Sequence, residues 1–308
     1  MRVLVTGGAG FIGSHVADRC VEMGHEVAVL DDLSTGREEH VHSRAKFFRV
    51  SLLDDGLEGV FKEFSPEIIS HHAAQVNVRR SVDDPAHDAQ VNVVGSIRLF
   101  QCAARHRCRK VIYASSGGAC YGEPKRLPAS ENTRVRPLCP YGVSKFAAEK
   151  YLQLFGDLHG LRYTILRYAN VYGPRQDPHG EAGVVAIFSE MMMAGKRPSI
   201  FGDGSKTRDY VYVDDIVEAN VLALTQGDGG TYNVGTGREV SDDQIFAAVR
   251  DAVGARMEPV YTEFRQGEVR RIALDAGRIR AELGWTPRVA LENGVPRAVA
   301  YYREKFCK

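Results

Sequence analysis

The sequence predicts an α/β fold built on a doubly wound parallel sheet, and two patterns in its first half support this prediction. Short apolar runs rich in β-branched residues occur at 3–5 and 27–30, as expected of parallel strands that are buried on both faces. A strand–helix–strand order that repeats several times predicts right-handed crossovers within one sheet. Further runs of this kind, each separated by a helical pattern, lie at 47–50, 68–70, 111–114 and 164–167.

The helices between and after these strands are predicted from local signals. Residues 13–23 have a helical pattern, and Gly24 is placed to end that helix. A second helix is expected from Tyr141 to about residue 158, because Pro140 precedes it and Gly160 follows it. Shorter helices are expected at 184–194, 215–225, 242–254 and 275–283.

The regular alternation of strands and helices ends near residue 170, where loops containing Gly and Pro replace it. We therefore expect a first unit, 1–169, that holds the doubly wound sheet. A smaller, partly interleaved α/β unit is expected at 170–308, with some of its segments returning to the first unit. The chain is long enough for either one large domain or two closely associated ones.

The composition excludes several classes of protein. The 308 residues include 40 Lys and Arg against 39 Asp and Glu, which gives a formal net charge of +1, and 44% of them are hydrophobic. This hydrophobic content argues against a disordered chain, and the charge balance argues against nucleic acid or an anionic membrane as a main partner. No apolar stretch approaches the roughly 18 residues that a membrane span needs.

The cysteine pattern and the start of the chain indicate a reducing compartment. The six cysteines include no C-x-x-C pair and no cluster with His at zinc-finger spacing, so we expect no metal site. The chain opens directly into the first strand pattern, without the features of a signal peptide. We therefore expect a cytoplasmic protein with reduced thiols.

A glycine-rich turn between the first strand and the first helix predicts a dinucleotide site. Gly7, Gly10 and Gly13 have a G-x-x-G-x-x-G spacing, which allows a tight turn and a close approach of the backbone to a pyrophosphate. The following helix would present N–H groups and a partial positive charge to that group. Asp31 ends the second strand, where a carboxylate accepts hydrogen bonds from a ribose and repels a 2′-phosphate. This pattern favours NAD over NADP, and a doubly wound sheet with this turn is a Rossmann fold.

A tyrosine and a lysine at the start of the predicted 141–158 helix form a candidate catalytic pair. The i, i+4 spacing puts Tyr141 and Lys145 on one face of the helix. A phenol has an ordinary pKa of about 10, and a neighbouring ammonium would favour its phenolate form. Ser115 and Ser116 end the predicted 111–114 strand, at the carboxyl edge where ligands of such sheets bind.

Together these motifs resemble the extended short-chain dehydrogenase/reductase superfamily and, within it, the UDP-glucose 4-epimerase family. The resemblance covers essentially the whole chain. The matching segments are 6–13, 31–36, 72–75, Asn92, 115–122, Tyr141 with Lys145, 167–170, 208–210 and 232–235.

The resemblance implies a mechanism in which C4 of a UDP-sugar is oxidised and then reduced on its other face. Tyr141 would take the proton from O4 of the sugar while the C4 hydride passes to tightly bound NAD. The 4-keto sugar would then turn about its diphosphate before the hydride returns. Lys145 would tune Tyr141 and bind the nicotinamide ribose, and a hydroxyl of Ser115 or Ser116 would hold O4.

The resemblance also implies binding residues and a homodimer. The dimer would form through the helix that starts at Tyr141 and the one near 92–105, where Phe146, Leu154, Leu99 and Phe100 are apolar. The residues implied for NAD are Gly7, Gly10, Phe11, Ile12, Gly13, Asp31, Asp32, Leu33, Ser34, Thr35, Gly36, Ser51, Leu52, Ala73, Ala74, Gln75, Asn92, Ser115, Tyr141, Lys145, Tyr168 and Val171. Those implied for the UDP-sugar are Ser116, Gly117, Tyr141, Asn170, Val184, Val185, Phe201, Arg208, Arg265 and Glu268.

The sequence departs from the family pattern at three informative positions. Gly117 stands where many epimerases have a third hydroxyl residue, so we assign the hydroxyl role to Ser116. Because Gly117 and Gly118 can do no proton chemistry, dehydration and decarboxylation are disfavoured. Ser51 replaces an Asp that contacts adenine in the family. Ile272 stands where a Tyr narrows the sugar pocket, so UDP-N-acetylglucosamine remains an alternative to UDP-glucose and UDP-galactose. UDP-glucuronate as substrate and a net NAD-dependent oxidoreductase activity are further alternatives.

Overall fold

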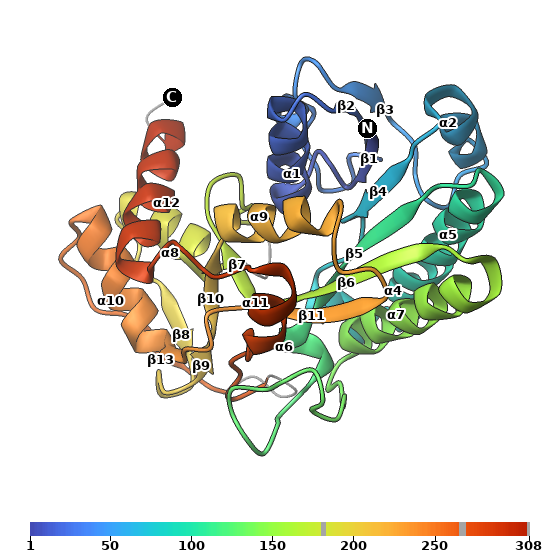
Figure 1. Cartoon of the computed structure of the whole chain (residues 1–308). Coiled ribbons are helices and arrows are strands. Elements are labelled where there is room, and N and C mark those ends of the chain that lie inside the picture. The colour runs from blue at the N-terminus through green and yellow to red at the C-terminus, as the bar shows by residue number, and fades with distance from the viewer. Residues whose placement is uncertain (180–182, 265–268, 307–308) are drawn as a thin grey trace.

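The computed structural model describes residues 1–179, 183–264 and 269–306, and a parallel sheet of seven strands dominates it (Figure 1). The strand order is β11-β6-β5-β4-β1-β2-β3, and every neighbouring pair is parallel. The predicted doubly wound fold is therefore confirmed. The strands of this sheet are β1 (Arg2–Thr6), β2 (Glu26–Leu30), β3 (Lys46–Phe48), β4 (Ile68–His71), β5 (Lys110–Ser116), β6 (Arg162–Tyr168) and β11 (Gly230–Val234).

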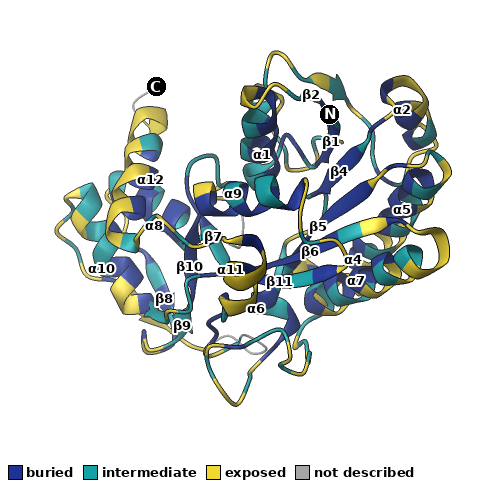
Figure 2. Ribbon diagram, in the orientation of Figure 1, coloured by how far each residue is buried: buried dark blue, intermediate teal, exposed yellow. Residues whose placement is uncertain are grey.

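Helices cover both faces of the sheet, so that the strands are buried over most of their length (Figure 2). One face packs against α1 (Phe11–Glu22), α9 (Val213–Ala223) and α11 (Gly277–Leu283). The other face packs against α2 (Leu57–Phe64), α5 (Gly95–Arg105) and α7 (Pro140–His159). The first half of the chain also contains three short helices, α3 (Val78–Asp83), α4 (Pro85–Ala89) and α6 (Gly117–Cys120). A 3₁₀ turn lies at Glu38–His40 and a π-helical turn at Gln90–Val94.

Alternate residues of one strand explain why the sheet needs both layers. Val3 and Val5 of β1 belong to the core beneath α1 and α9, whereas Leu4 belongs to the core beneath α2 and α5. All three side chains are fully buried. A strand that is apolar on both faces is stable only when helices cover both faces, which is why the continuous apolar runs in the sequence predicted this architecture.

The second half of the chain builds a smaller layer beside the sheet. Its helices α8 (Val184–Met193), α10 (Asp242–Val253) and α12 (Leu291–Phe306) share a separate hydrophobic core and gather on the left of Figure 1. Three two-stranded pairs accompany them, β10-β7, β12-β9 and β13-β8. Their bounds are β7 (Asn170–Tyr172), β8 (Ser199–Phe201), β9 (Thr207–Arg208), β10 (Tyr210–Tyr212), β12 (Val240–Ser241) and β13 (Val260–Thr262).

Several boundaries differ from the predicted ones. Helix α1 begins at Phe11 rather than residue 13, so Gly13 lies within its first turn. Helix α9 begins two residues earlier than predicted, and α11 two residues later. Strand β11 is not among the predicted strands; it returns from the second half, as expected of some segments there, and forms one edge of the main sheet. In the described part of the chain, no helix is long and apolar enough to cross a membrane.

One buried carboxylate fastens the C-terminal part of the chain to α9. The carboxylate of Asp215 accepts backbone hydrogen bonds from Arg288 at 2.9 Å and Val289 at 3.1 Å. Its backbone carbonyl accepts a third bond, from the indole N–H of Trp285 at 2.8 Å. Asp215 is 3% exposed, and losing its carboxylate would leave two partly buried backbone N–H groups without this acceptor.

We predict that Asp215→Ala lowers the free energy of unfolding by about 2–4 kcal/mol, the usual cost of breaking a buried hydrogen-bond network. The neighbouring Asp214 is exposed and shares the first turn of α9. Asp214→Ala should therefore cost less than about 1 kcal/mol, through the helix dipole alone. Urea unfolding followed by Trp285 fluorescence measures both, and equal losses for the two variants would contradict the assignment.

Candidate active site

The glycine-rich turn lies where the sheet order reverses between β1 and β4. The loop after β1 and the loop after β4 approach so closely that a Cβ on Gly7 would lie 2.6 Å from the backbone nitrogen of Ala73. Gly7 also has a φ of +66°, which favours glycine. A Cβ on Gly13 would lie 2.2 Å from the carbonyl oxygen of Gly7. The turn therefore requires glycine at both positions, as the motif predicted.

The start of α1 suits an anionic group. Gly10 precedes the helix and offers no side-chain cap, and the first turn contains no acidic residue. The first N–H groups of a helix have no partner within the helix, so they remain available to an external acceptor such as a pyrophosphate. The predicted residues Phe11 and Ile12 form this first turn.

Asp31 lies at the end of β2, next to the glycine-rich turn. Its carboxylate is 7% exposed and accepts backbone hydrogen bonds from Ala9 at 3.0 Å and Leu33 at 2.9 Å. Burial raises the pKa of this carboxyl group, and the two hydrogen bonds oppose that shift. The loop of Asp32, Leu33, Ser34, Thr35 and Gly36 follows, with Gly36 packed against the carboxylate.

The candidate catalytic pair lies at the start of α7. Desolvation raises the pKa of the Tyr141 phenol, and a hydrogen bond with Ser116 opposes that shift. Lys145 is 4% exposed, and burial lowers the pKa of its ammonium to about 8. Its Nζ atom lies 4.7 Å from the centre of the Tyr113 ring. The protein environment alone thus disfavours the charged forms of both Tyr141 and Lys145.

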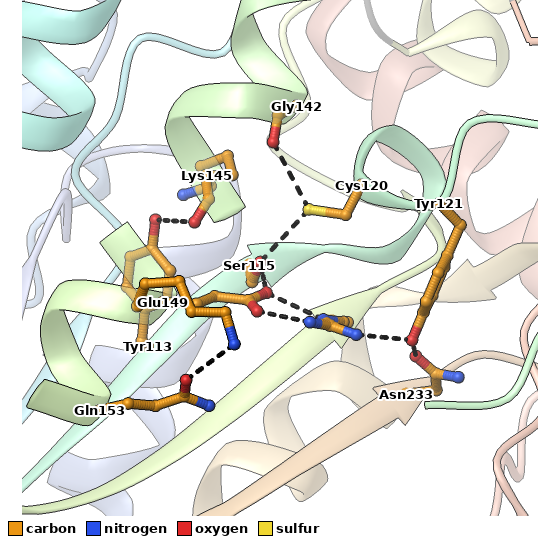
Figure 3. A network of polar contacts seen from close by, with 11 residues as sticks. Tyr113, Ser115, Cys120, Tyr121, Gly142, Lys145, Glu149, Gln153 and Asn233 are labelled. Atoms are coloured by element: carbon orange, nitrogen blue, oxygen red, sulfur yellow. Dashed lines mark hydrogen bonds and ion pairs between the residues drawn. The ribbon is translucent and has the colours of Figure 1, made fainter. Parts of the chain in front are cut away.

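The two serines at the end of β5 have different partners. Ser116 begins α6 and accepts a hydrogen bond from the backbone N–H of Ala119 at 3.2 Å, and it also bonds the Tyr141 phenol. Ser115 is 3% exposed and donates to the carboxylate of Glu149 at 2.5 Å (Figure 3). Of the two candidates, Ser116 is therefore the hydroxyl beside the phenol, whereas Ser115 belongs to a buried polar network.

This network is centred on an ion pair that joins α7 to the sheet. Arg167 of β6 donates to the carboxylate of Glu149 at 2.5 and 2.9 Å. It also donates to the phenol of Tyr121 at 2.9 Å, and Tyr121 donates in turn to Asn233 of β11 at 2.8 Å. Figure 3 shows how these groups converge beneath the start of α7. The network therefore couples the catalytic helix to β5, β6 and the returning strand β11.

The missing hydroxyl at Gly117 has a steric explanation. A Cβ at this position would lie 2.5 Å from Cδ1 and 2.9 Å from Cδ2 of Leu274. Leu274 is fully buried and packs in a small cluster with Tyr121, Ala129 and Ile272. Its side chain therefore occupies the space that a third hydroxyl residue would need. No sequence pattern indicated this contact.

A second polar cluster lies behind the catalytic pair, on the loop after β4 and the helices that follow. Asn92, in the π-helical turn, accepts from the backbone N–H of Gln75 at 2.8 Å. Its amide nitrogen lies 2.9 Å from the carbonyl of Gln75, 3.1 Å from Asp88 and 3.1 Å from the hydroxyl of Ser144. Asn92 is 1% exposed and is engaged at both ends of its amide. These bonds join the loop after β4 to α4 and α7.

Other residues predicted for NAD lie around the same edge of the sheet. Ser51 starts a turn after β3, where its backbone N–H donates to Asp54 at 2.9 Å. Leu52 is a core residue, 4% exposed. Tyr168 ends β6 and accepts a hydrogen bond from Asn220 at 2.8 Å. Ala73 and Ala74 lie in the loop after β4, and Val171 lies in β7.

The residues predicted for the UDP-sugar lie mainly on the second half of the chain. Asn170 of β7 has its side-chain oxygen 3.6 Å from the position of a Cβ on Gly118, so the sheet edge and the second half meet here. Val184 and Val185 begin α8, and Phe201 ends β8. Arg265 and Glu268 lie outside the described residues.

Arg208 and Asp209 do not pair with each other within the described ranges. Arg208 donates to the carbonyl of Thr207 at 2.8 Å. Asp209 is 1% exposed, and its carboxylate accepts hydrogen bonds from the backbone of Thr236, Gly237 and Leu274. Asp209 is therefore a clamp that holds the loop after β11 and the segment carrying Leu274. No sequence pattern indicated this role of Asp209.

The described side chains include no group of three or more His, Cys, Asp and Glu residues that could hold a metal ion. A reversed sheet order, a glycine-rich turn and an acidic residue at the end of β2 define a dinucleotide-binding protein of the Rossmann class.

Comparisons with known proteins identify the family within this class. Residues 3–235 match the model of the NAD dependent epimerase/dehydratase family. A UDP-glucose 4-epimerase of Mycolicibacterium smegmatis is 51% identical over 311 residues, which cover 99% of each chain. The chain therefore belongs to the NAD dependent epimerase/dehydratase family, as the sequence resemblance predicted.

Two solved structures are similar over almost the whole chain. The UDP-glucose 4-epimerase of Thermotoga maritima, solved with UDP-glucose, has a TM-score of 0.98 and 47% identity, covering 99% of this chain and 100% of that one. The enzyme of the same name from Thermus thermophilus, in complex with NAD, has a TM-score of 0.94 and 45% identity, covering 98% and 99%.

We predict that Gly117→Thr alone destabilises the protein by roughly 1–3 kcal/mol, because its side chain would overlap Leu274. Adding Leu274→Ala should recover part of that loss, since the smaller side chain vacates the overlapping space. Leu274→Ala by itself should cost about 2–5 kcal/mol through the cavity it leaves. Thermal unfolding of the three variants measures this coupling, and strictly additive losses would contradict the proposed overlap.

Proposed function

We propose that the protein is an NAD-dependent epimerase that inverts C4 of a UDP-hexose, with UDP-glucose and UDP-galactose as the interconverted pair. The observation that carries the proposal is the position of Tyr141 and Lys145. They lie in the first two turns of α7, where the Tyr141 phenol bonds Ser116 at the carboxyl end of β5. The three relatives described above, which have the name UDP-glucose 4-epimerase, support the same activity.

The chain offers a fitting site for NAD. The N–H groups at the start of α1 would bind the pyrophosphate, Asp31 would accept from the adenosine ribose, and Lys145 would bind the nicotinamide ribose. NAD supplies the hydride acceptor for C4 of the sugar and the hydride donor for its return. Its oxidised ring also carries a positive charge, which favours the phenolate form of Tyr141 against the desolvation found there.

The chain's own residues handle the proton at O4. Tyr141, as phenolate, takes this proton when C4 is oxidised and returns it when C4 is reduced. Ser116 bonds the phenol and orients it toward O4, while the Lys145 ammonium stabilises the phenolate. A buried site suits such a cycle, because the proton and the hydride both return to the sugar and no exchange with water is needed.

We also propose that the two halves of the chain bind different ligands. Residues 1–169 would bind NAD, and residues 170–308 would supply most contacts to the UDP group, although β11 returns to the first unit. Arg208 would provide a cation for the diphosphate, with Asn170, Val184, Val185 and Phe201 around the nucleotide. Ile272 is 2% exposed and packs inside a core cluster, so its small size alone gives no argument for a larger sugar.

We expect purified protein to interconvert UDP-galactose and UDP-glucose without added NAD, because the cofactor is regenerated in each cycle. Tyr141→Phe should reduce kcat by about 10²–10⁴-fold, the usual contribution of a general acid–base group. Tyr163→Phe is a matched control, since Tyr163 lies at the opposite end of β6 from the site. Nuclear magnetic resonance of the product mixture measures turnover. Stoichiometric accumulation of NADH, or no epimer even with NAD supplied, would refute the proposal.

We also propose a homodimer formed through helix α7. Four apolar side chains of this helix face solvent, namely Val143, Tyr151, Leu154 and Leu158, with exposures of 55%, 40%, 46% and 67%. We call them the α7 face. Leu99 and Phe100, which the sequence offered as further interface residues, are fully buried and belong to the core. The apolar α7 face favours association, since solvated helix faces are usually polar.

The oligomeric state should respond to one charge on the α7 face. We expect the wild-type protein to elute with twice the mass of one chain in size-exclusion chromatography with light scattering. Leu154→Arg should shift this population to monomer, because the substitution would bury a charge in the interface. Met23→Arg is the control, since Met23 is 42% exposed at the end of α1, on the other side of the sheet. A monomeric wild type would contradict the proposal.

We propose a cytoplasmic location. The five described cysteines, Cys20, Cys102, Cys108, Cys120 and Cys139, are all free thiols, which suits a reducing compartment.

A further inference from the structure

A buried carboxylate behind the catalytic pair has no role in the mechanism above. Asp88 of α4 is 1% exposed. Its Oδ1 atom accepts hydrogen bonds from the side-chain amide of Gln75 at 2.9 Å and from that of Asn92 at 3.1 Å. Its Oδ2 atom is buried and has no hydrogen-bond partner in the described ranges. Buried carboxylate oxygens are rarely left without a partner, so this one calls for an explanation.

Asp88 reaches the catalytic helix through two residues. The Asn92 amide that bonds Asp88 also lies 3.1 Å from the hydroxyl of Ser144. Ser144 is on α7, one residue before Lys145, and donates to the backbone carbonyl of Tyr141 at 3.0 Å. The carboxylate is thus connected by hydrogen bonds to the turn of α7 that carries both catalytic side chains.

The groups around Lys145 leave Asp88 as its uncompensated negative neighbour. The acidic groups that act on its ammonium are the Cys120 thiol, Glu149 and Asp88. Glu149 is neutralised by its ion pair with Arg167 at 2.5 Å, and burial raises the pKa of Cys120 to about 12, so this thiol is neutral. The two imidazoles that face Lys145 are His71 and His72, and burial lowers the pKa of both, to about 3 for His72.

Asp88 is also the uncompensated negative neighbour of the Tyr141 phenol. The groups that raise the pKa of its phenol by their charge are Cys120, Cys139 and Asp88. Burial also raises the pKa of the Cys139 thiol, which is therefore neutral. Tyr113, whose ring centre lies 4.7 Å from the Nζ atom of Lys145, has a pKa raised well above its ordinary value and is neutral too. Asp88 is the carboxylate among these neighbours that no described ion pair balances.

We propose that Asp88 is a positioning residue: its carboxylate is the buried counter-charge of the Lys145 ammonium and, through Asn92 and Ser144, holds the start of α7 in place. A negative charge favours the protonated form of every group near it, so it raises the pKa of Lys145 and of Tyr141 together. Removing the charge should move both to lower values. This inference rests on the proposed epimerase function in one respect, because the pH dependence of kcat can be measured only if the protein turns over a UDP-sugar.

The test compares Asp88→Asn, which keeps the shape but removes the charge, with Asp83→Asn, an exposed carboxylate at the end of α3. We expect both limbs of the kcat profile of Asp88→Asn to shift to lower pH by roughly one unit, and Asp83→Asn to match the wild type. Asp88→Glu should restore the wild-type limbs. A lower kcat with unmoved limbs would indicate a merely structural role and overturn the proposal.

A second readout does not depend on turnover. In purified protein labelled with ¹³C-lysine, the Lys145 resonance, assigned with Lys145→Arg, should titrate about one pH unit lower in Asp88→Asn than in wild type. If Asp88→Asn does not fold, the ionisation of Asp88 is measured instead in wild-type protein labelled with ¹³C-aspartate. The Asp88 resonance is assigned by its absence in Asp88→Glu. The Asp88 carboxylate should be ionised throughout the titration of Lys145, and a protonated Asp88 would overturn the proposal. A protein that turns over no UDP-sugar yet shows the Lys145 shift would refute the function and keep this inference.

Discussion

The buried ion pair between Glu149 and Arg167 is the interaction on which the geometry of the site depends. Glu149 is fully buried on the inner face of α7, and Arg167 lies in β6 at 5% exposure. Breaking such a pair by removing one partner typically costs about 3–5 kcal/mol, because the remaining charge stays buried without compensation. The pair also holds Ser115 and Tyr121, so the end of β5, the end of α6 and the helix of Tyr141 form one unit. The catalytic groups are thereby held on rigid elements rather than on loops.

A second constraint is the close approach of two loops at the carboxyl edge of the sheet. The turn after β1 and the loop after β4 touch where the strand order reverses, and glycine at position 7 makes this contact possible. The same loop after β4 leads to Gln75, Asn92 and Asp88. The cofactor side and the catalytic side of the site are therefore connected through a single loop, and a change in that loop affects both.

Much of the site could be predicted from the sequence because its main motifs are local. Gly7 to Gly13 and Tyr141 with Lys145 are short patterns with a fixed spacing, and their placement depends only on the strand or helix that carries them. The predictions failed where a contact joins residues far apart in the chain. Leu274 fills the space beside Gly117, and Asp209 clamps the loop after β11; neither contact has a sequence signal. Leu99 and Phe100 show the same limit, since an apolar pattern does not distinguish a core face from an interface.

The fate of the hydrogen at C4 tests the central claim most directly. UDP-galactose carrying deuterium at C4 of the sugar would be incubated with the protein in ordinary water, and the UDP-glucose formed would be analysed by mass spectrometry and NMR. If Tyr141 moves only the O4 proton and the C4 hydride returns to the same sugar, the deuterium remains at C4 of the product. Exchange of this deuterium with solvent would contradict the account, because it would mean that C4 is inverted by proton abstraction rather than by transient oxidation.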